Sequence, residues 1–197
     1  MLNVPKAFAL DLAQAEAHFR ELSRIVHPDR FATSDPRAKR FSTQRTVQLN
    51  EAWRTLKDPV RRAEYLLSQA GFDIGAETGA SRPGNSAGAR EKIALPAGLL
   101  ARVLELREDL ADARSDGDQA RVQSLAGQVR QRLGETMEHV AATFAEMPKV
   151  PSCQPEPTSQ PALESIAHDL IELRYLRRFL DEVDAHDEAQ AAGSTHA

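Results

Sequence analysis

Apolar residues in this chain recur every three or four positions, which is the period of an amphipathic α-helix. Six segments follow this pattern, and proline, glycine or aspartate residues stand between them. No segment alternates apolar and polar residues as a half-buried strand does. The pattern predicts an all-α protein whose helices span about residues 12–26, 36–57, 59–70, 96–114, 119–147 and 162–187.

Aspartate followed by proline marks the start of two of these helices, at Asp35 and Asp58. The carboxylate can accept hydrogen bonds from the free amides of the first turn, and proline fits the first helical position. The preceding helix is expected to end near Val26, because Pro28 disfavours a helical conformation at His27. The helix after Asp35 is expected to turn its apolar residues inward, namely Phe41, Leu49, Ala52, Trp53 and Leu56.

Two segments poor in apolar residues divide the chain. Five of the ten glycines lie between residues 71 and 88, and five of the eleven prolines lie between residues 148 and 161. Such segments bury too little apolar surface to offset their conformational entropy. The expected organisation is a helical hairpin with short helices (1–71), a linker with a low-complexity insertion (72–95), a three-helix bundle with a proline-rich loop at 148–161 (96–187), and a disordered tail (188–197).

Composition narrows the functional classes. The chain is 41% hydrophobic but only 5% aromatic, and its formal net charge of −4 argues against a general nucleic-acid binder. Its single cysteine, Cys153, cannot form an internal disulfide and is too little for a zinc or cluster site, so we expect no metal and no cofactor. No apolar run or signal peptide predicts a membrane segment, and the expected location is the cytoplasm.

The tripeptide His27-Pro28-Asp29 follows the first helix directly. Arg20, Arg24 and His27 are spaced by four and three residues, so they share one helix face. A second basic cluster opens the next helix, at Arg37, Lys39, Arg40 and Arg45. This local basic surface on an acidic protein fits a docking element for another protein, and an ordinary helix stop is the alternative interpretation of the tripeptide. For the second cluster, a solvated charged face is the alternative interpretation.

A longer motif surrounds this tripeptide. The run "LNEAWRTLKDPVRRAEYLL" (residues 49–67), placed after "HPD", resembles the J-domain of DnaJ-type co-chaperones. Within it, "RAEYLL" (62–67), together with "LELRE" (104–108), resembles the HscB family, the J-domain co-chaperones of iron–sulfur cluster assembly. The resemblance covers residues 2–71 and about 92–184. The sequence shows neither the Gly/Phe-rich linker nor the zinc region of general J-proteins.

The resemblance implies a co-chaperone rather than an enzyme. Its N-terminal J-domain would dock on a DnaK-class, HscA-like ATPase and stimulate ATP hydrolysis, through Arg20, Arg24, His27, Pro28 and Asp29. Its C-terminal bundle would bind an IscU-like scaffold protein that carries a nascent cluster, through Leu100, Leu104, Glu105, Glu108, Asp112 and Tyr175. Burial of Leu100 and Leu104 in the bundle core is the alternative, although Leu99, Val103, Leu106 and Leu110 already supply a core stripe.

Other classes of protein fit less well. A general J-domain co-chaperone with a different client is the runner-up. An enzyme using His27 and Asp29 as an acid–base pair is disfavoured, because Pro28 between them hinders the oriented bond that such catalysis needs. A phosphotransfer bundle would need a lysine near His139 or His168, and neither has one in helical register. The acidic total charge also counts against a DNA-binding helix pair.

Overall fold

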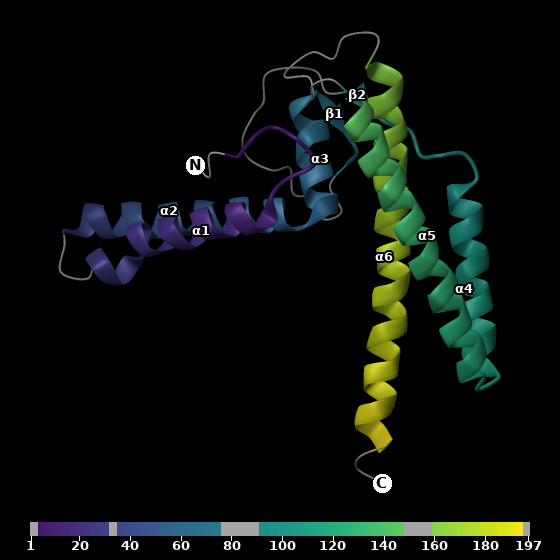
Figure 1. Ribbon diagram of the computed structural model, residues 1–197. Helices are drawn as coiled ribbons and strands as arrows, with labels where there is room; N and C mark the ends of the chain where they lie inside the picture. Colours follow the sequence, from purple (N-terminus) through teal and green to yellow (C-terminus); the bar gives the residue numbers. More distant parts are fainter. Residues whose placement is uncertain (1–3, 32–34, 76–90, 148–158, 195–197) are drawn as a thin grey trace.

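The computed structural model describes residues 4–31, 35–75, 91–147 and 159–194, and its architecture is all-α apart from one minimal strand pair. In Figure 1 a hairpin of two helices projects sideways from three long helices that run alongside one another. The predicted fold class, a helical N-terminal unit joined to a three-helix bundle, is therefore confirmed.

The N-terminal unit begins and ends its helices where the capping signals predict. The Asp11 carboxylate accepts a hydrogen bond from the Gln14 amide at 2.9 Å, and Asp35 and Asp58 cap the next two helices in the same way. The elements are α1 (Leu12–Val26), the 3₁₀ turn η1 (Pro28–Phe31), α2 (Pro36–Lys57) and α3 (Pro59–Gln69). Local sequence alone therefore determines these boundaries.

Helices α1 and α2 form the antiparallel hairpin, and the stacked rings of Phe19 and Trp53, 5.1 Å apart, join them near its base. The prediction that Phe41 points inward is wrong, because 57% of its surface is exposed. Ser42 takes the inward position instead and donates a hydrogen bond to the Val26 carbonyl at 2.6 Å. The other described elements at this end are α1 and the short turn η1, and they leave Phe41 exposed.

The C-terminal bundle consists of α4 (Leu99–Ser115), α5 (Gln119–Glu146) and α6 (Gln160–Ser194). Helix α4 begins three residues later than predicted, because Gly98 adopts a left-handed conformation with φ of +73°. Helix α6 extends through residues 188–194, where the sequence predicts a disordered tail. Alanine, glutamate and glutamine dominate this stretch, and their high helix propensity favours continuation.

A strand pair that the sequence pattern does not predict connects the two units. Strands β1 (Phe72–Asp73) and β2 (Glu91–Lys92) are parallel, with Phe72 opposite Glu91. Both lie in the predicted linker, yet Phe72 is buried, and Ile74 and Ile93 pack against the same core. Both ends of the predicted linker are therefore part of the folded core. Residues 76–90 of the insertion and 148–158 of the proline-rich loop, with Cys153, lie outside the described residues.

The main hydrophobic core is shared between the N-terminal unit and the bundle. One face of α3 packs against α5 and α6, through Val60, Ala63, Leu66 and Leu67 on α3, Val140 and Phe144 on α5, and Leu163, Ile166, Leu170 and Leu173 on α6. A second core lies within the bundle, where Leu110, Val122, Val129 and Phe179 meet. The two units are therefore packed as one body in the described chain.

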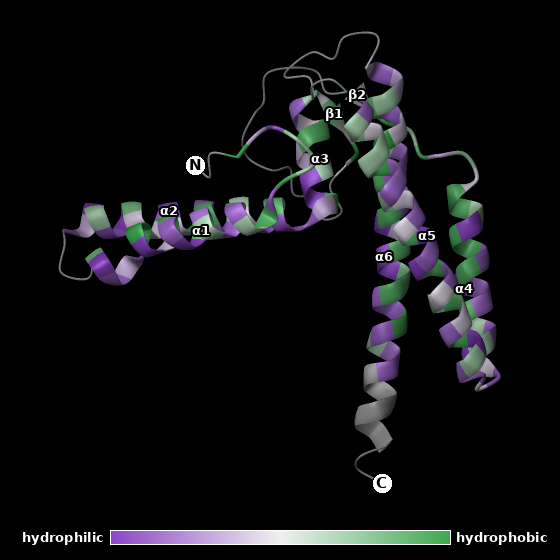
Figure 2. Cartoon of the chain, in the orientation of Figure 1, coloured by the Kyte–Doolittle hydropathy of each residue, from purple (hydrophilic) through white to green (hydrophobic). Residues whose placement is uncertain are grey.

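Figure 2 shows hydrophilic and hydrophobic residues interspersed along the described helices. Among the residues that the structure describes, no helix is long and apolar enough to cross a membrane.

The shared core predicts that both units unfold together. Leu67 is 1% exposed within this core, so Leu67→Ala should lower the free energy of unfolding by about 2–5 kcal/mol. Leu100→Ala, at an exposed leucine, is the matched control and should change it by less than about 0.5 kcal/mol. Urea unfolding followed by Trp53 fluorescence and by helical circular dichroism should give coincident transitions in wild type. Two separate transitions would contradict a shared core.

Candidate docking surfaces and the junction between them

The His27-Pro28-Asp29 turn lies at the tip of the α1–α2 hairpin. His27 leaves the helix with ψ of 132°, and its carbonyl accepts a hydrogen bond from the Arg30 amide at 3.1 Å. Its ring Nδ1 accepts a hydrogen bond from the Asp29 amide at 3.3 Å. The turn is thus closed by its own groups.

The Asp29 carboxylate remains available to a partner. Its side chain is 90% exposed, and its Oδ2 lies 3.4 Å from the same His27 Nδ1 that already accepts the amide proton. The imidazole and carboxylate therefore do not form the oriented bond of an acid–base pair. An exposed carboxylate on a proline-stiffened turn is suited instead to accept a charge-assisted hydrogen bond from a cation on another protein.

Two hydroxyl groups of α2 hold the end of α1 in front of this turn. Ser42 Oγ and Thr46 Oγ1 donate to the Val26 carbonyl at 2.6 and 3.2 Å. A carbonyl in the last turn of a helix lacks its intrahelical partner, so these bonds satisfy it and fix the direction in which the chain leaves. Neither residue was expected from the sequence to have a role at the turn. Their signal is a pair of hydroxyl side chains four residues apart on the inner face of α2.

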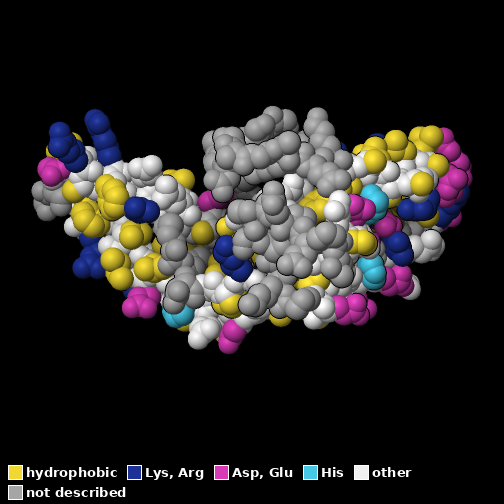
Figure 3. All heavy atoms as spheres, turned by 90° about the horizontal axis from the view of Figure 1, so that it is seen from above, with side chains coloured by type: hydrophobic (Ala, Val, Ile, Leu, Met, Phe, Trp, Pro, Cys, Tyr) yellow, Lys and Arg dark blue, Asp and Glu magenta, His cyan; other side chains and the backbone are white. Residues whose placement is uncertain are grey.

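The predicted basic residues of α1 are exposed. Arg20 Nη2 forms an ion pair with Glu16 Oε1 at 2.6 Å, which offsets part of its charge. Arg24 forms no ion pair with any described residue, and its carbonyl accepts a hydrogen bond from Arg30 Nη1 at 3.4 Å. Figure 3 shows Lys and Arg side chains gathered at the end of the molecule that α1 and α2 form.

The outer side of α4 carries the second predicted surface. Leu100 and Leu104 are 55% and 59% exposed, whereas Leu99 and Leu110 are each 1% exposed, so only the latter two belong to a core. This outer strip of α4 also contains exposed carboxylates that form no ion pair with described residues, namely Glu105, Glu108 and Asp112. An apolar surface bordered by unpaired negative charge is suited to an apolar partner with a basic rim.

Tyr175, the sixth residue predicted for this surface, lies on α6 and not on α4. It is partly exposed on α6, and no hydrogen bond or ring contact links it to α4 within the described part of the chain. Its part in this surface remains a prediction.

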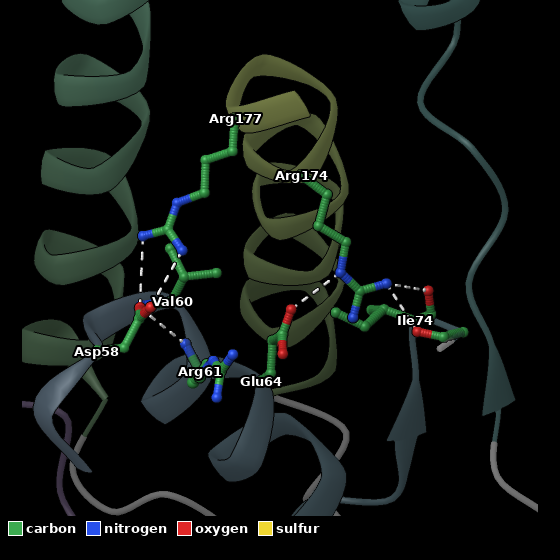
Figure 4. A network of polar contacts seen from close by, with 8 residues as sticks. Asp58, Val60, Arg61, Glu64, Ile74, Arg174 and Arg177 are labelled. Carbon is green, nitrogen blue, oxygen red and sulfur yellow. Dashed lines mark hydrogen bonds and ion pairs between the residues drawn. The ribbon is translucent and has the colours of Figure 1, made fainter. Parts of the chain in front are cut away.

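Two arginines of α6 fasten the bundle to the N-terminal unit (Figure 4). Arg177 donates to both carboxylate oxygens of Asp58, at 3.2 and 3.4 Å. Arg174 pairs with Glu64 at 2.9 Å and also donates to the carbonyls of Ile74 and Gly75, at 3.0 and 2.7 Å. These contacts tie α6 to the start and middle of α3 and to the chain after β1. Two-point bonds of this kind fix orientation as well as distance.

Asp58 has two structural roles at this junction. Besides pairing with Arg177, its Oδ1 caps α3 by accepting from the Val60 and Arg61 amides at 2.9 and 3.3 Å. Burial by itself would raise the pKa of Asp58, but the hydrogen bonds and charge of Arg177, together with these amides, lower it overall. The ionised carboxylate is therefore favoured in the folded chain.

The N-terminal segment is anchored at the same junction. The Phe8 ring stacks on Phe144 of α5 at 4.9 Å, and its carbonyl accepts a hydrogen bond from buried Arg62 at 2.6 Å. Arg62 also donates to the Leu56 carbonyl and lies over the Phe8 ring. Burial lowers the pKa of Arg62. Its guanidinium still donates to the Phe8 and Leu56 carbonyls. The sequence pattern alone does not predict these contacts.

The lowered pKa of Asp58 predicts a specific acid sensitivity. The ordinary pKa of an aspartate is 3.8, and as the pH falls Asp58 takes up a proton in the unfolded chain before it does so in the folded chain. The contribution of Asp58 to stability is therefore complete above about pH 5 and is lost as the pH falls further. Asp58→Asn removes the titrating group and should flatten the curve of unfolding free energy against pH between about pH 5 and 2. Arg177→Gln should flatten it in part. Curves parallel to wild type would show that Asp58 contributes no such linkage.

Comparisons with known proteins agree with this architecture. The family model described as HSCB C-terminal oligomerisation domain matches residues 95–184. The co-chaperone protein HscB homolog of Shewanella baltica (strain OS195) is 30% identical, over 96% of this chain and 95% of its own length. The homolog of Burkholderia multivorans is 34% identical, over 71% and 73% of the two chains.

Solved structures show the same fold. Chaperone HscB from Vibrio cholerae superposes with a TM-score of 0.71 at 25% identity, covering 96% of both chains. Human co-chaperone protein HscB superposes with a TM-score of 0.70 at 22% identity, covering 94% of this chain and 79% of its own. The match in sequence over nearly the full length, together with the exposed His-Pro-Asp turn, shows that the chain belongs to the HscB co-chaperone family.

Proposed function

We propose that this chain is a J-domain co-chaperone of iron–sulfur cluster assembly. It stimulates the ATPase of a DnaK-class, HscA-like chaperone and delivers an IscU-like scaffold protein to that chaperone. The observation that carries the proposal is the exposed His-Pro-Asp turn at the hairpin tip of an HscB-family chain. In this function the chain performs no chemistry of its own and acts through two docking surfaces.

The tip supplies the contact with the chaperone. Asp29 offers a free carboxylate, while Arg20 and Arg24 present positive charge on the helix that leads to it. An acidic surface near an arginine on the chaperone would complement this arrangement. The hydroxyls of Ser42 and Thr46 hold the turn in place before binding, so little conformational entropy is lost when the chaperone docks.

The outer strip of α4 supplies the contact with the scaffold protein. Leu100 and Leu104 would bury their exposed surface against an apolar region of the scaffold, and the carboxylates of Glu105, Glu108 and Asp112 would meet basic residues around it. In Figure 1 the hairpin tip and α4 lie on opposite sides of the molecule. Both partners can therefore bind at once without competing for space on this chain.

The chaperone contact is tested by His27→Gln, which removes the acceptor of the Asp29 amide and the exposed imidazole. Stimulation of the chaperone ATPase should fall to the basal rate, while circular dichroism stays unchanged because the His27 side chain is more than half exposed. His18→Gln on α1, outside the turn, is the matched control and should stimulate as wild type does. Full stimulation by the His27 variant would rule out this docking turn.

The scaffold contact is tested by Leu104→Ala combined with Tyr175→Ala. Calorimetric titration with an IscU-like protein should show binding weakened roughly 10- to 100-fold, as for the loss of one or two central contacts. Leu12→Ala on α1, also at an exposed leucine, is the control and should bind normally. If wild type stimulates the ATPase but binds no scaffold, the chain is a J-domain co-chaperone with another client.

A further inference from the structure

The hairpin tip exposes two large apolar side chains that the His-Pro-Asp turn does not explain. Ile25 is 50% exposed at the end of α1, and Phe41 is 57% exposed at the start of α2. Ile25 directly precedes Val26, and Phe41 directly precedes Ser42. Ser42 Oγ donates a hydrogen bond to the Val26 carbonyl at 2.6 Å, which joins the two helices. In an antiparallel helix pair, the residues before two facing positions lie on the same side of the pair. Ile25 and Phe41 therefore form one patch, here called the tip patch.

Unpaired positive charge borders the tip patch. The Arg45 guanidinium lies 4.9 Å from the centroid of the Phe41 ring and donates to Gln48 Oε1 at 3.3 Å. Arg37 is exposed one turn before Phe41. Neither arginine forms an ion pair within the described part of the chain. In the bundle, by contrast, several arginines form an ion pair with a carboxylate. They are Arg114, Arg121, Arg130, Arg132, Arg174 and Arg177.

This combination has the composition of a binding hot spot rather than of an ordinary surface. Isolated exposed apolar residues are common on folded proteins. An aromatic ring beside a second large apolar side chain, with arginine stacked on it, is instead typical of the centre of an interface. The arginines require an acidic rim on the partner, and the ring requires an apolar group within that rim.

We propose that the tip patch is a second docking surface for the DnaK-class chaperone, which contributes an apolar side chain flanked by carboxylates. This inference rests on the proposed function. Ile25 is only two residues from His27, so a protein that covers the turn also reaches the patch. A partner with a basic rim, as the α4 strip requires, would be repelled here.

The test compares Phe41→Ala with Val47→Ala in the full chain. Val47 is 62% exposed on the same helix, but it lies six residues from Phe41 and so on a different side. The measurement is the concentration of this chain that gives half-maximal stimulation of the chaperone ATPase. Phe41→Ala should raise that concentration roughly five- to tenfold, as for a lost hot-spot side chain, and leave the maximal rate unchanged. Val47→Ala should match wild type.

The outcomes separate this inference from the proposed function. If wild type stimulates and both variants match it, the tip patch is not a chaperone contact, while the proposed function stands. If wild type does not stimulate at all, the proposed function fails, and this inference fails with it. The alternative partner for the tip patch is the acidic α4 strip of a second copy of this chain. Sedimentation that shows a wild-type dimer lost in Phe41→Ala, with unchanged half-maximal stimulation, would assign the patch to self-association and overturn the proposal.

Discussion

The junction between α3 and α6 is the feature on which the rest of this structure depends. Its interior is a hydrophobic core to which both units contribute, and its rim carries the ion pairs of Arg177 with Asp58 and of Arg174 with Glu64. Apolar burial supplies most of the free energy, because it scales with the area removed from water. The arginines add direction, since each joins defined atoms on both units. A hairpin of two helices has little core of its own, so its base gains stability from the bundle.

Charge is distributed differently on the two sides of this junction. At the junction and in the bundle, arginines pair with carboxylates and hold helices together, as Arg114 and Arg130 do with Glu182 and Asp184. Among the described residues, Arg24, Arg37 and Arg45 near the hairpin tip form no ion pair, and neither do the carboxylates on the outer strip of α4. Unpaired charge contributes little to folding but selects partners and speeds their encounter. The hairpin tip and the outer strip of α4 therefore favour partners of opposite local charge.

Much of the fold follows from local sequence. Asp35-Pro36 and Asp58-Pro59 predict helix starts correctly, because capping and the fixed φ of proline act within one turn. Inward and outward positions are harder to predict, as Phe41 and Ser42 show, because burial depends on whether a third element covers the helix pair. The junction could not be predicted at all. Arg177 and its partner Asp58 are far apart in the sequence, as are Arg174 and Glu64, and only the folded chain brings α6 against α3. The strip on α4 is exposed as its helical spacing indicates.

The most direct test of the rigid junction is the distance in solution between the two candidate docking surfaces. Spin labels placed through Gln44→Cys on α2 and Ala111→Cys on α4, with Cys153→Ser to remove the native thiol, would report that distance by pulsed electron paramagnetic resonance. Both positions are exposed, so the labels leave the core intact. A fixed junction predicts one narrow distance distribution that broadens when Arg174 and Arg177 are both changed to glutamine. A distribution already broad with both arginines in place would contradict a rigid connection between the two surfaces.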